Sequence, residues 1–198
     1  MKVFLYNLTF EAPFGLRVGS GDRSGNELQP LMIDQETVAI PESSWKGAFR
    51  RLSEQLCDKV VNLPEEFSKR LEGNTYKEFD ILYGTGEFAG RITFSASVIK
   101  GVRITPRAHT VIDRRRKTVL EKHLFTEAIA YPERVDVKVI VRGEEVLDCW
   151  ERTLRFVKLH GIFIGSGKSR GVGYLVLRRV LKAEVSDLLG EVRFKEWT

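Results

Sequence analysis

The amino-acid sequence predicts an α+β fold in which two helices alternate with four strands, in the order β-α-β-β-α-β. Short stretches with an apolar residue at every second position alternate with two longer stretches whose apolar residues recur every three or four positions. The chain has 198 residues, 42% of them hydrophobic. That length suits one compact domain, residues 1–198, with large insertions, and is short for two full domains.

The first strand is predicted for residues 2–10, where Phe4, Tyr6, Leu8 and Phe10 share one face. A segment rich in glycine and proline follows and is predicted to be a loop-like insertion, residues 11–41.

The first helix is predicted to follow Ser43 or Ser44, because either serine can cap it. Lys46 and Arg50, four residues apart, share one face of this helix. Another face carries apolar residues at helical spacing, namely Trp45, Phe49, Leu52, Leu56 and Val60. A short second helical stretch is predicted around residues 65–71.

The second and third strands are predicted for residues 91–99 and 134–142, where apolar residues alternate again. Residues 100–132 between them are basic and are predicted to be an irregular, thumb-like insertion. The second helix covers residues 144–160 and the last strand residues 172–182. Four antiparallel strands with two helices on one face, in this order, make the ferredoxin-like fold that RNA-recognition domains also use.

Basic residues are concentrated in a few segments, although the net charge is only +5. Residues 100–123 hold eight basic and two acidic residues, and residues 155–179 hold six basic residues and no acidic one. Residues 45–51 form a third basic segment. This segregation favours an anionic partner, most simply a nucleic-acid backbone. Solvated basic faces scattered around the fold would give the same pattern.

Other classes of protein are disfavoured by composition. No apolar run approaches the ~20 residues that a membrane helix needs, and the N-terminus lacks the apolar run of a secretion signal. Cys57 and Cys149 are too few for a disulfide scaffold or a four-cysteine zinc site, and are predicted to be small buried hydrophobic residues. We therefore expect a soluble, cytoplasmic protein with no membrane contact and no resident metal.

A glycine-rich turn spans residues 165–173 and contains a Gly-Lys-Ser sequence. It departs from the phosphate loop of nucleoside triphosphatases because position 162 is isoleucine, and from the dinucleotide fingerprint because position 170 is arginine. Glycines let a backbone approach a phosphate closely, and successive N–H groups can bind an anion. The turn is either such a phosphate contact, with Lys168 and Arg170 adding charge, or a tight helix-to-strand connection.

Four segments of the chain form an ordered set: Ile40 to Arg50 with its Ser-Ser-Trp-Lys-Gly sequence, residues 81–94, residues 111–114, and the glycine-rich turn. Together they resemble the signatures of the CRISPR RAMP superfamily. Their order is similar to that of its Cas7-type, Csm3-like backbone subunits from type III effector complexes. The third segment resembles the start of the thumb that projects from these subunits.

The resemblance implies a ferredoxin-like subunit that stacks with copies of itself and other Cas subunits along a guide (CRISPR) RNA, which pairs with a complementary target RNA. It implies that the first helix, the thumb and the glycine-rich turn contact the guide RNA. The candidate RNA-binding residues are Ser43, Ser44, Lys46, Arg50, Arg107, Arg114, Arg115, Arg116, Gly165, Gly167, Lys168, Arg170, Gly171 and Gly173. No tightly bound cofactor is expected.

Csm3-like subunits cut target RNA with an aspartate in the loop after the first strand. In this chain Leu28 occupies the matching position, Glu27 is shifted by one residue, and Asp22 lies in the same loop. A carboxylate there would act in acid–base chemistry or help to bind Mg²⁺. Either Glu27 or Asp22 serves as the catalytic residue, or this chain binds RNA without cutting it.

Three further functions stay open. A Cas6-like precursor-RNA endonuclease has a similar glycine-rich loop, but usually has two ferredoxin-like units and an N-terminal histidine, whereas the first histidine here is His109. A terminal RAMP subunit of the Csm4, Csm5 or Cmr type, without catalysis, shares the same motifs. A ferredoxin-like interaction domain that binds no nucleic acid would retain no RNA at physiological salt.

Overall fold

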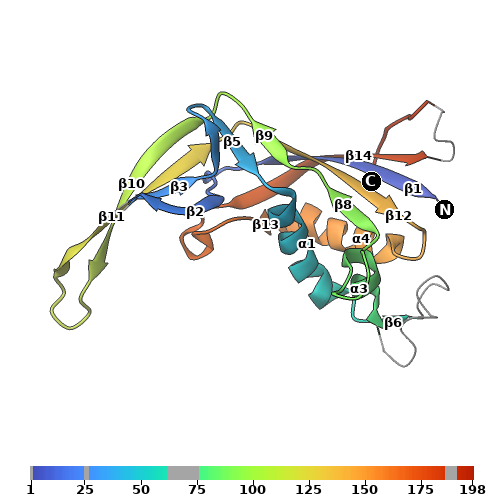
Figure 1. Ribbon diagram of the computed structural model, residues 1–198, viewed down its shortest axis with the longest axis horizontal. Coiled ribbons are helices and arrows are strands. Elements are labelled where there is room, and N and C mark those ends of the chain that lie inside the picture. The colour runs from blue at the N-terminus through green and yellow to red at the C-terminus, as the bar shows by residue number, and fades with distance from the viewer. Residues whose placement is uncertain (1, 25–26, 62–75, 186–190) are drawn as a thin grey trace.

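A six-stranded antiparallel sheet forms the centre of the protein in the computed structural model, which describes residues 2–24, 27–61, 76–185 and 191–198 (Figure 1). Its strand order is β13-β14-β1-β12-β8, with β15 beside β14. This is the predicted ferredoxin-like arrangement, in which the first strand lies between the last strand and the third. The strands are β1 (Val3–Glu11), β8 (Ile92–Phe94), β12 (Val135–Arg142), β13 (Ile162–Phe163), β14 (Tyr174–Val185) and β15 (Lys195–Glu196).

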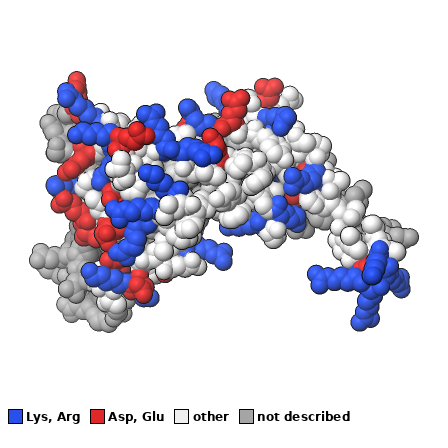
Figure 2. All heavy atoms as spheres, turned by 180° about the vertical axis from the view of Figure 1, so that it is seen from behind, with Lys and Arg blue, Asp and Glu red and all other residues white. Residues whose placement is uncertain are grey.

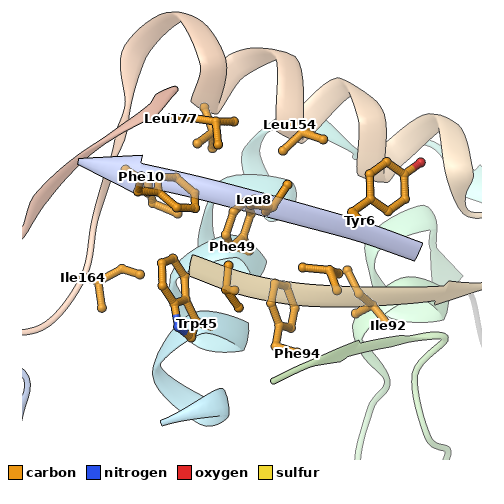
Figure 3. Packing of buried hydrophobic residues seen from close by; sticks show 14 of the residues in the cluster. Tyr6, Leu8, Phe10, Trp45, Phe49, Ile92, Phe94, Leu154, Ile164 and Leu177 are labelled. Atoms are coloured by element: carbon orange, nitrogen blue, oxygen red, sulfur yellow. The ribbon is translucent and has the colours of Figure 1, made fainter. Parts of the chain in front are cut away.

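The core lies between this sheet and the helices that cover one of its faces (Figures 1 and 3). The helices are α1 (Glu42–Leu56), α3 (Glu78–Tyr83) and α4 (Leu147–His160). β1 alternates as predicted, with the four aromatic and leucine residues of its inner face buried. Phe49 of α1 lies at the centre, where its ring is 5.2 Å from that of Trp150 and 5.4 Å from that of Phe94. Among the helices described, none combines the length and the apolar composition needed to cross a bilayer.

The start and end of α1 differ from the prediction. Pro41 is the N-cap residue, and Ser43 and Ser44 lie inside the first turn without capping hydrogen bonds from their side chains. The backbone angle that the proline ring fixes, φ −60°, suits the residue that enters a helix, and the Pro41 carbonyl accepts hydrogen bonds from the N–H groups of Ser44 and Trp45. The helix ends at Leu56, and Val60 lies instead in β6 (Val60–Val61), which pairs with β7 (Tyr76–Lys77). The helix expected around residues 65–71 falls outside the described residues.

The strand predicted for residues 91–99 is divided between two sheets. β8 ends at Phe94, and β9 (Ser97–Ile99) joins β5 (Thr37–Ile40) and β4 (Met32–Asp34) in a separate sheet. An alternation that starts from the buried Ile92 and Phe94 would bury residue 96 next, but Ser97 is buried instead. The Ser97 hydroxyl accepts a hydrogen bond from Trp45 Nε1 at 3.0 Å and donates one to the Asp136 carbonyl. A buried polar residue therefore shifts the inward-facing positions by one.

Both segments predicted to lack regular structure contain strands. The glycine- and proline-rich segment forms β4 and β5 together with β2 (Gly19–Ser24) and β3 (Glu27–Pro30). The basic insertion is a long hairpin of β10 (Arg103–Ile112) and β11 (Val119–Tyr131), which projects from the body in Figure 1. β3 pairs with β11, giving a sheet of order β10-β11-β3-β2. Most of β10 is exposed on both faces, so no apolar alternation marks it as a strand.

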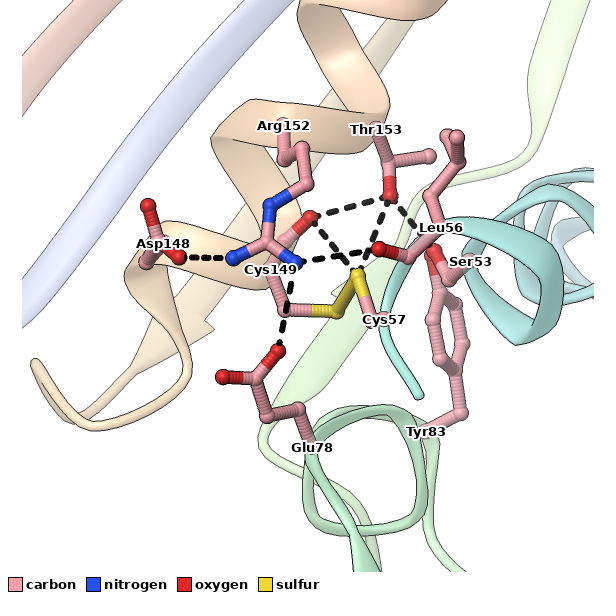
Figure 4. Close-up of a disulfide and its surroundings, with 9 residues drawn as sticks. All are labelled: Ser53, Leu56, Cys57, Glu78, Tyr83, Asp148, Cys149, Arg152 and Thr153. Atoms are coloured by element: carbon pink, nitrogen blue, oxygen red, sulfur yellow. Dashed lines mark hydrogen bonds and ion pairs between the residues drawn. A yellow bond between two sulfur atoms is a disulfide. The ribbon is translucent and has the colours of Figure 1, made fainter. Parts of the chain in front are cut away.

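The two cysteines are buried as predicted, and they also form a disulfide, which the sequence analysis did not expect (Figure 4). Cys57 directly follows α1 and Cys149 lies in α4, so the bond joins the two helices. Beside it the Ser53 hydroxyl is 3.0 Å from the Tyr83 hydroxyl and 2.8 Å from that of Thr153. The cysteines are 92 residues apart, and their spacing alone gave no sign that they meet.

Candidate nucleic-acid interface

A groove of ≈710 Å³ runs along α1 and separates it from the glycine-rich turn, and we call it the α1–turn groove. Its wall on the α1 side includes Ser43, Ser44 and Arg51, and its opposite wall includes Lys168 and the end of α4. None of the described residues that line it is an aspartate or a glutamate. The groove therefore offers cations and hydroxyls to an anionic chain without a competing carboxylate.

The helical repeat of α1 places these groups on one face. Ser44, Gly47 and Arg51 follow each other at spacings of three and four residues, so they lie in a row along the helix. A Cβ added at Gly47 would meet no heavy atom within 4 Å, so this glycine leaves the helix backbone open to the groove. The sequence-based selection missed Arg51, although its spacing from Ser44 and Gly47 carried the signal.

Lys46 and Arg50 line a second groove of ≈510 Å³ on another side of α1, beside α3 and β8; we call it the α1–α3 groove. Arg50 is already engaged there: its Nε is 3.1 Å from Glu54 and its Nη1 donates to the Gly84 carbonyl at 2.9 Å. Glu42 lines the same groove. The structure thus separates the predicted pair Lys46 and Arg50 from Lys168, while Ser43 lines both grooves.

The glycine-rich turn is shaped by contacts within the chain. A Cβ on Gly165 would lie 2.2 Å from the Arg17 carbonyl oxygen, and one on Gly173 would lie 2.0 Å from that of Ile164. Both have positive φ, as do Gly167 and Gly171. The N–H groups of Ser166 and of residues 170–173 donate to carbonyls of the chain itself. Within the turn, an anion would therefore meet the N–H groups around Lys168 and its side chain.

Arg170 is held by Glu127, a residue that the sequence did not single out. The Glu127 carboxylate, on β11, is 0% exposed and forms ion pairs with Arg170 and with Arg17, whose Nη2 is 3.3 Å away. His109 Nε2, from β10, lies 3.1 Å from the other carboxylate oxygen. A buried carboxylate needs such partners, because desolvating an unpaired charge is costly. The partners come from three distant segments, so no local motif announced this cluster.

The remaining basic candidates lie on the projecting hairpin. Arg114, Arg115 and Arg116 are exposed in the turn at its end, where Figure 2 shows Lys and Arg side chains gathered. Asp113 shapes this turn by accepting hydrogen bonds from the N–H groups of Arg115 and Arg116. Arg107 is exposed nearer the base of the hairpin, in register with Glu127. Four of the candidate cations thus belong to one element.

The candidate catalytic residues lie on paired strands at the base of the hairpin. Asp22 is in β2 and Glu27 is in β3, where it pairs in register with Thr126; their side chains lie outside the described part of the structure. Leu28 pairs with Glu127, whose carboxylate is occupied by the ion pairs described above.

Mg²⁺ prefers a set of oxygen ligands. Among the described residues, three potential metal ligands lie close together at Cys57, Glu78 and Cys149. This group is at the C-terminal end of α1, and its two cysteines form the disulfide. The side chains of Asp22 and Glu27 are not among those described, so a Mg²⁺ site at the base of the hairpin stays a prediction.

Comparison with known proteins places the chain in a family. The model of the RAMP superfamily matches residues 8–176. The chain belongs to the RAMP superfamily. A search of the curated proteins found no match. Among solved structures, this RAMP protein is similar to a chain in the cryo-EM structure of the type III-B Cmr-beta bound to cognate target RNA, with a TM-score of 0.60 and 15% identity. The match covers 91% of this RAMP protein and 61% of the chain in the Cmr-beta structure. The two therefore share a fold over about three fifths of the longer chain.

Proposed function

We propose that this protein is an RNA-binding, Cas7-type backbone subunit of a type III CRISPR effector complex, and that guide RNA runs through the α1–turn groove. Membership of the RAMP superfamily supports this, as does the fold shared with a chain of a type III-B Cmr-beta structure that contains target RNA. The observation that carries the proposal is the groove itself, which lies between two family motifs and whose lining, in the part of the chain that the structure describes, contains no acidic residue.

Each wall of the groove suits a sugar–phosphate backbone. Lys168 and Arg51 supply charge from opposite sides, and the Ser43 and Ser44 hydroxyls lie in the first turn of α1, where the helix dipole favours an anion. Gly47 allows the backbone of the RNA to approach the helix closely. The α1–α3 groove is the weaker candidate because Glu42 lines it and Arg50 is already paired.

The projecting hairpin extends the basic surface beyond the body of the subunit. Its end combines the exposed arginines with exposed apolar side chains, Ile112 at 61% and Val119 at 56%. Cations contact phosphates and an apolar side chain can insert between bases. In this proposal the hairpin clamps RNA near the junction with the next copy of the subunit or with another Cas subunit.

Target RNA is bound without being cut in this proposal, and no Mg²⁺ is required. The position that matches the family's aspartate is Leu28, and the carboxylate beside it in register, Glu127, is buried and neutralised by two arginines. We expect complementary RNA to stay intact with Mg²⁺. Cleavage that Asp22→Ala or Glu27→Ala abolishes would overturn this part and assign the activity to that residue.

The direct test is a titration of labelled single-stranded RNA of increasing length at ~150 mM salt, with a DNA duplex as a competitor. We expect one further protein to bind per fixed increment of RNA length. Lys168→Ala should weaken binding more than Lys46→Ala, because the two residues line different grooves. Lys138→Ala, an exposed lysine on β12, is the control for loss of charge alone.

The same titration separates the alternatives. A Cas6-like endonuclease would cut a precursor repeat RNA and would not add proteins in proportion to RNA length. A terminal RAMP subunit would bind once, whatever the length. An interaction domain would retain no RNA, either alone or after reconstitution with partner Cas subunits.

A further inference from the structure

The Glu127 cluster lies where three segments meet: the hairpin, the glycine-rich turn, and residues 15–18 between them. Leu16 pairs with Ala130 of β11, and the Arg17 carbonyl accepts a hydrogen bond from Ser166 N–H at 3.0 Å. The fully buried carboxylate of Glu127 sits at this junction and contacts an arginine from each of the other two segments. One side chain therefore connects all three.

The outer part of the glycine-rich turn depends on this side chain for its attachment. The N–H groups of Arg170, Gly171 and Val172 donate to the carbonyls of Gly167 and Lys168, so these bonds close within the turn. Among the described residues, the polar contact that joins the short 3-10 turn Lys168–Arg170 to another element is the Arg170–Glu127 ion pair. Lys168 belongs to the same turn and lines the α1–turn groove.

We propose that Glu127 is a positioning residue for the groove: it tethers the turn through Arg170 and so holds Lys168 at the groove wall. Arg170 then serves RNA binding indirectly, through this tether. The Arg170 side chain is 40% exposed, but the carboxylate that it pairs with is fully buried, so losing Arg170 leaves a buried charge with one charged partner fewer. The RNA-binding part of this inference rests on the proposed function, whereas the tether itself does not.

Hydrogen exchange tests the tether without RNA. In Arg170→Gln the hydrogen-bonded amides of residues 170–172 should exchange several-fold faster than in the native protein, because local opening sets their exchange rate. Arg178→Gln is the matched control: it removes an arginine from a surface ion pair, with Glu11, on the adjoining strand β14, and should leave these amides unchanged. Equal exchange in Arg170→Gln and the native protein would overturn the proposal, whatever the protein binds.

RNA binding tests how Arg170 acts. If the tether works through Lys168, the double variant Arg170→Gln/Lys168→Ala should bind RNA no more weakly than Lys168→Ala alone. If Arg170 instead contacts a phosphate itself, the two losses in affinity should multiply, and the slope of log affinity against log salt should fall by about 0.7 more. That second result would overturn the positioning role.

The variant Glu127→Gln distinguishes the two roles of Arg170, because they predict opposite changes in RNA affinity. Loss of the tether should weaken RNA binding several-fold, whereas a freed Arg170 that contacts phosphate would strengthen it and overturn the proposal. Should this variant fail to fold because Arg17 is left buried and unpaired, the Arg170 and Lys168 variants decide the question. If the native protein binds no RNA, the proposed function fails, while the exchange experiment still decides the tether.

Discussion

The body of the protein and its projecting hairpin are stabilised by different forces. In the body, aromatic rings from the sheet and both long helices pack around Phe49, with Trp150 and Trp45 fully buried. The hairpin has strand-to-strand hydrogen bonds along its length, its strand β10 is largely exposed, and ion pairs to Glu127 join its base to the body. Apolar burial thus fixes the fold, and a few charged contacts fix the orientation of the surface that we assign to RNA.

The largest expected effect is in the body. Phe49→Ala should lower the free energy of unfolding by about 3–5 kcal/mol, because it leaves a cavity between Trp150 and Phe94. Ile112→Ala, in the exposed end of the hairpin, is the control and should change it by less than about 0.5 kcal/mol. Urea unfolding measures both, and equal losses would contradict the contrast between the two regions.

The disulfide should strengthen the body without affecting the hairpin. Reducing Cys57–Cys149 should lower the free energy of unfolding by about 2–4 kcal/mol, since the bond closes a loop of 92 residues. Thermal unfolding with and without reductant measures the change, and RNA affinity in reductant should stay as it was. Cys57→Ser/Cys149→Ser should be insensitive to reductant. Two free thiols in the untreated protein would refute the prediction.

The hairpin end should matter for RNA and hardly at all for stability. Replacing Arg114, Arg115 and Arg116 by alanine should reduce the slope of log RNA affinity against log salt by about two units. Each phosphate contact to a single strand contributes about 0.7 to this slope. The melting temperature should stay within a few degrees, since these side chains are exposed. Arg193→Ala, 81% exposed at the C-terminal side, controls for net charge. An unchanged slope would remove the hairpin from the proposed interface.

The smallest effect concerns acid stability of the body. Burial raises the pKa of Glu151, but hydrogen bonds from Lys182 Nζ at 2.7 Å and the Tyr6 hydroxyl at 2.9 Å outweigh it and leave the pKa below its ordinary value. Its stabilising contribution is therefore present above the ordinary glutamate pKa and is lost as the pH falls through the lowered one.

Glu151→Gln should cost about 1 kcal/mol at pH 7 and less at pH 3. Thermal unfolding of the variant and the native protein at both pH values checks this. A stability difference that grows toward acid would contradict the stated direction of the pKa shift.

The elements that were predicted well are those with one buried face. β1, β12 and α4 lie close to their expected bounds because apolar residues recur at the strand or helix period. The hairpin and the strands of residues 11–41 escaped prediction because their pairing partners, rather than a pattern of burial, make them strands. Ser97 shows the same limit inside a predicted strand, since its burial depends on hydrogen bonds to Trp45 and Asp136.

The candidate site divides in the same way. The residue types at α1 and the glycine-rich turn identified two segments that do face one another across a groove. The family resemblance placed Lys46 and Lys168 against the same RNA, yet the two residues line different grooves, and Arg51 is the α1 cation that lines the groove with Lys168. Whether a basic side chain faces a groove depends on how its helix is rotated about its axis. The packing of the helix against its neighbours determines that rotation.

The sequence by itself determined the ferredoxin-like order of the elements, the buried faces of its helices and strands, and the basic segments, because each follows from periodicity or composition. Tertiary structure decided the rest. It joined Cys57 to Cys149, paired β3 with β11, and brought Arg17, His109 and Arg170 to one buried carboxylate at Glu127. Such contacts link residues far apart in the chain, and their free energy exists only once the surrounding core has excluded water from them.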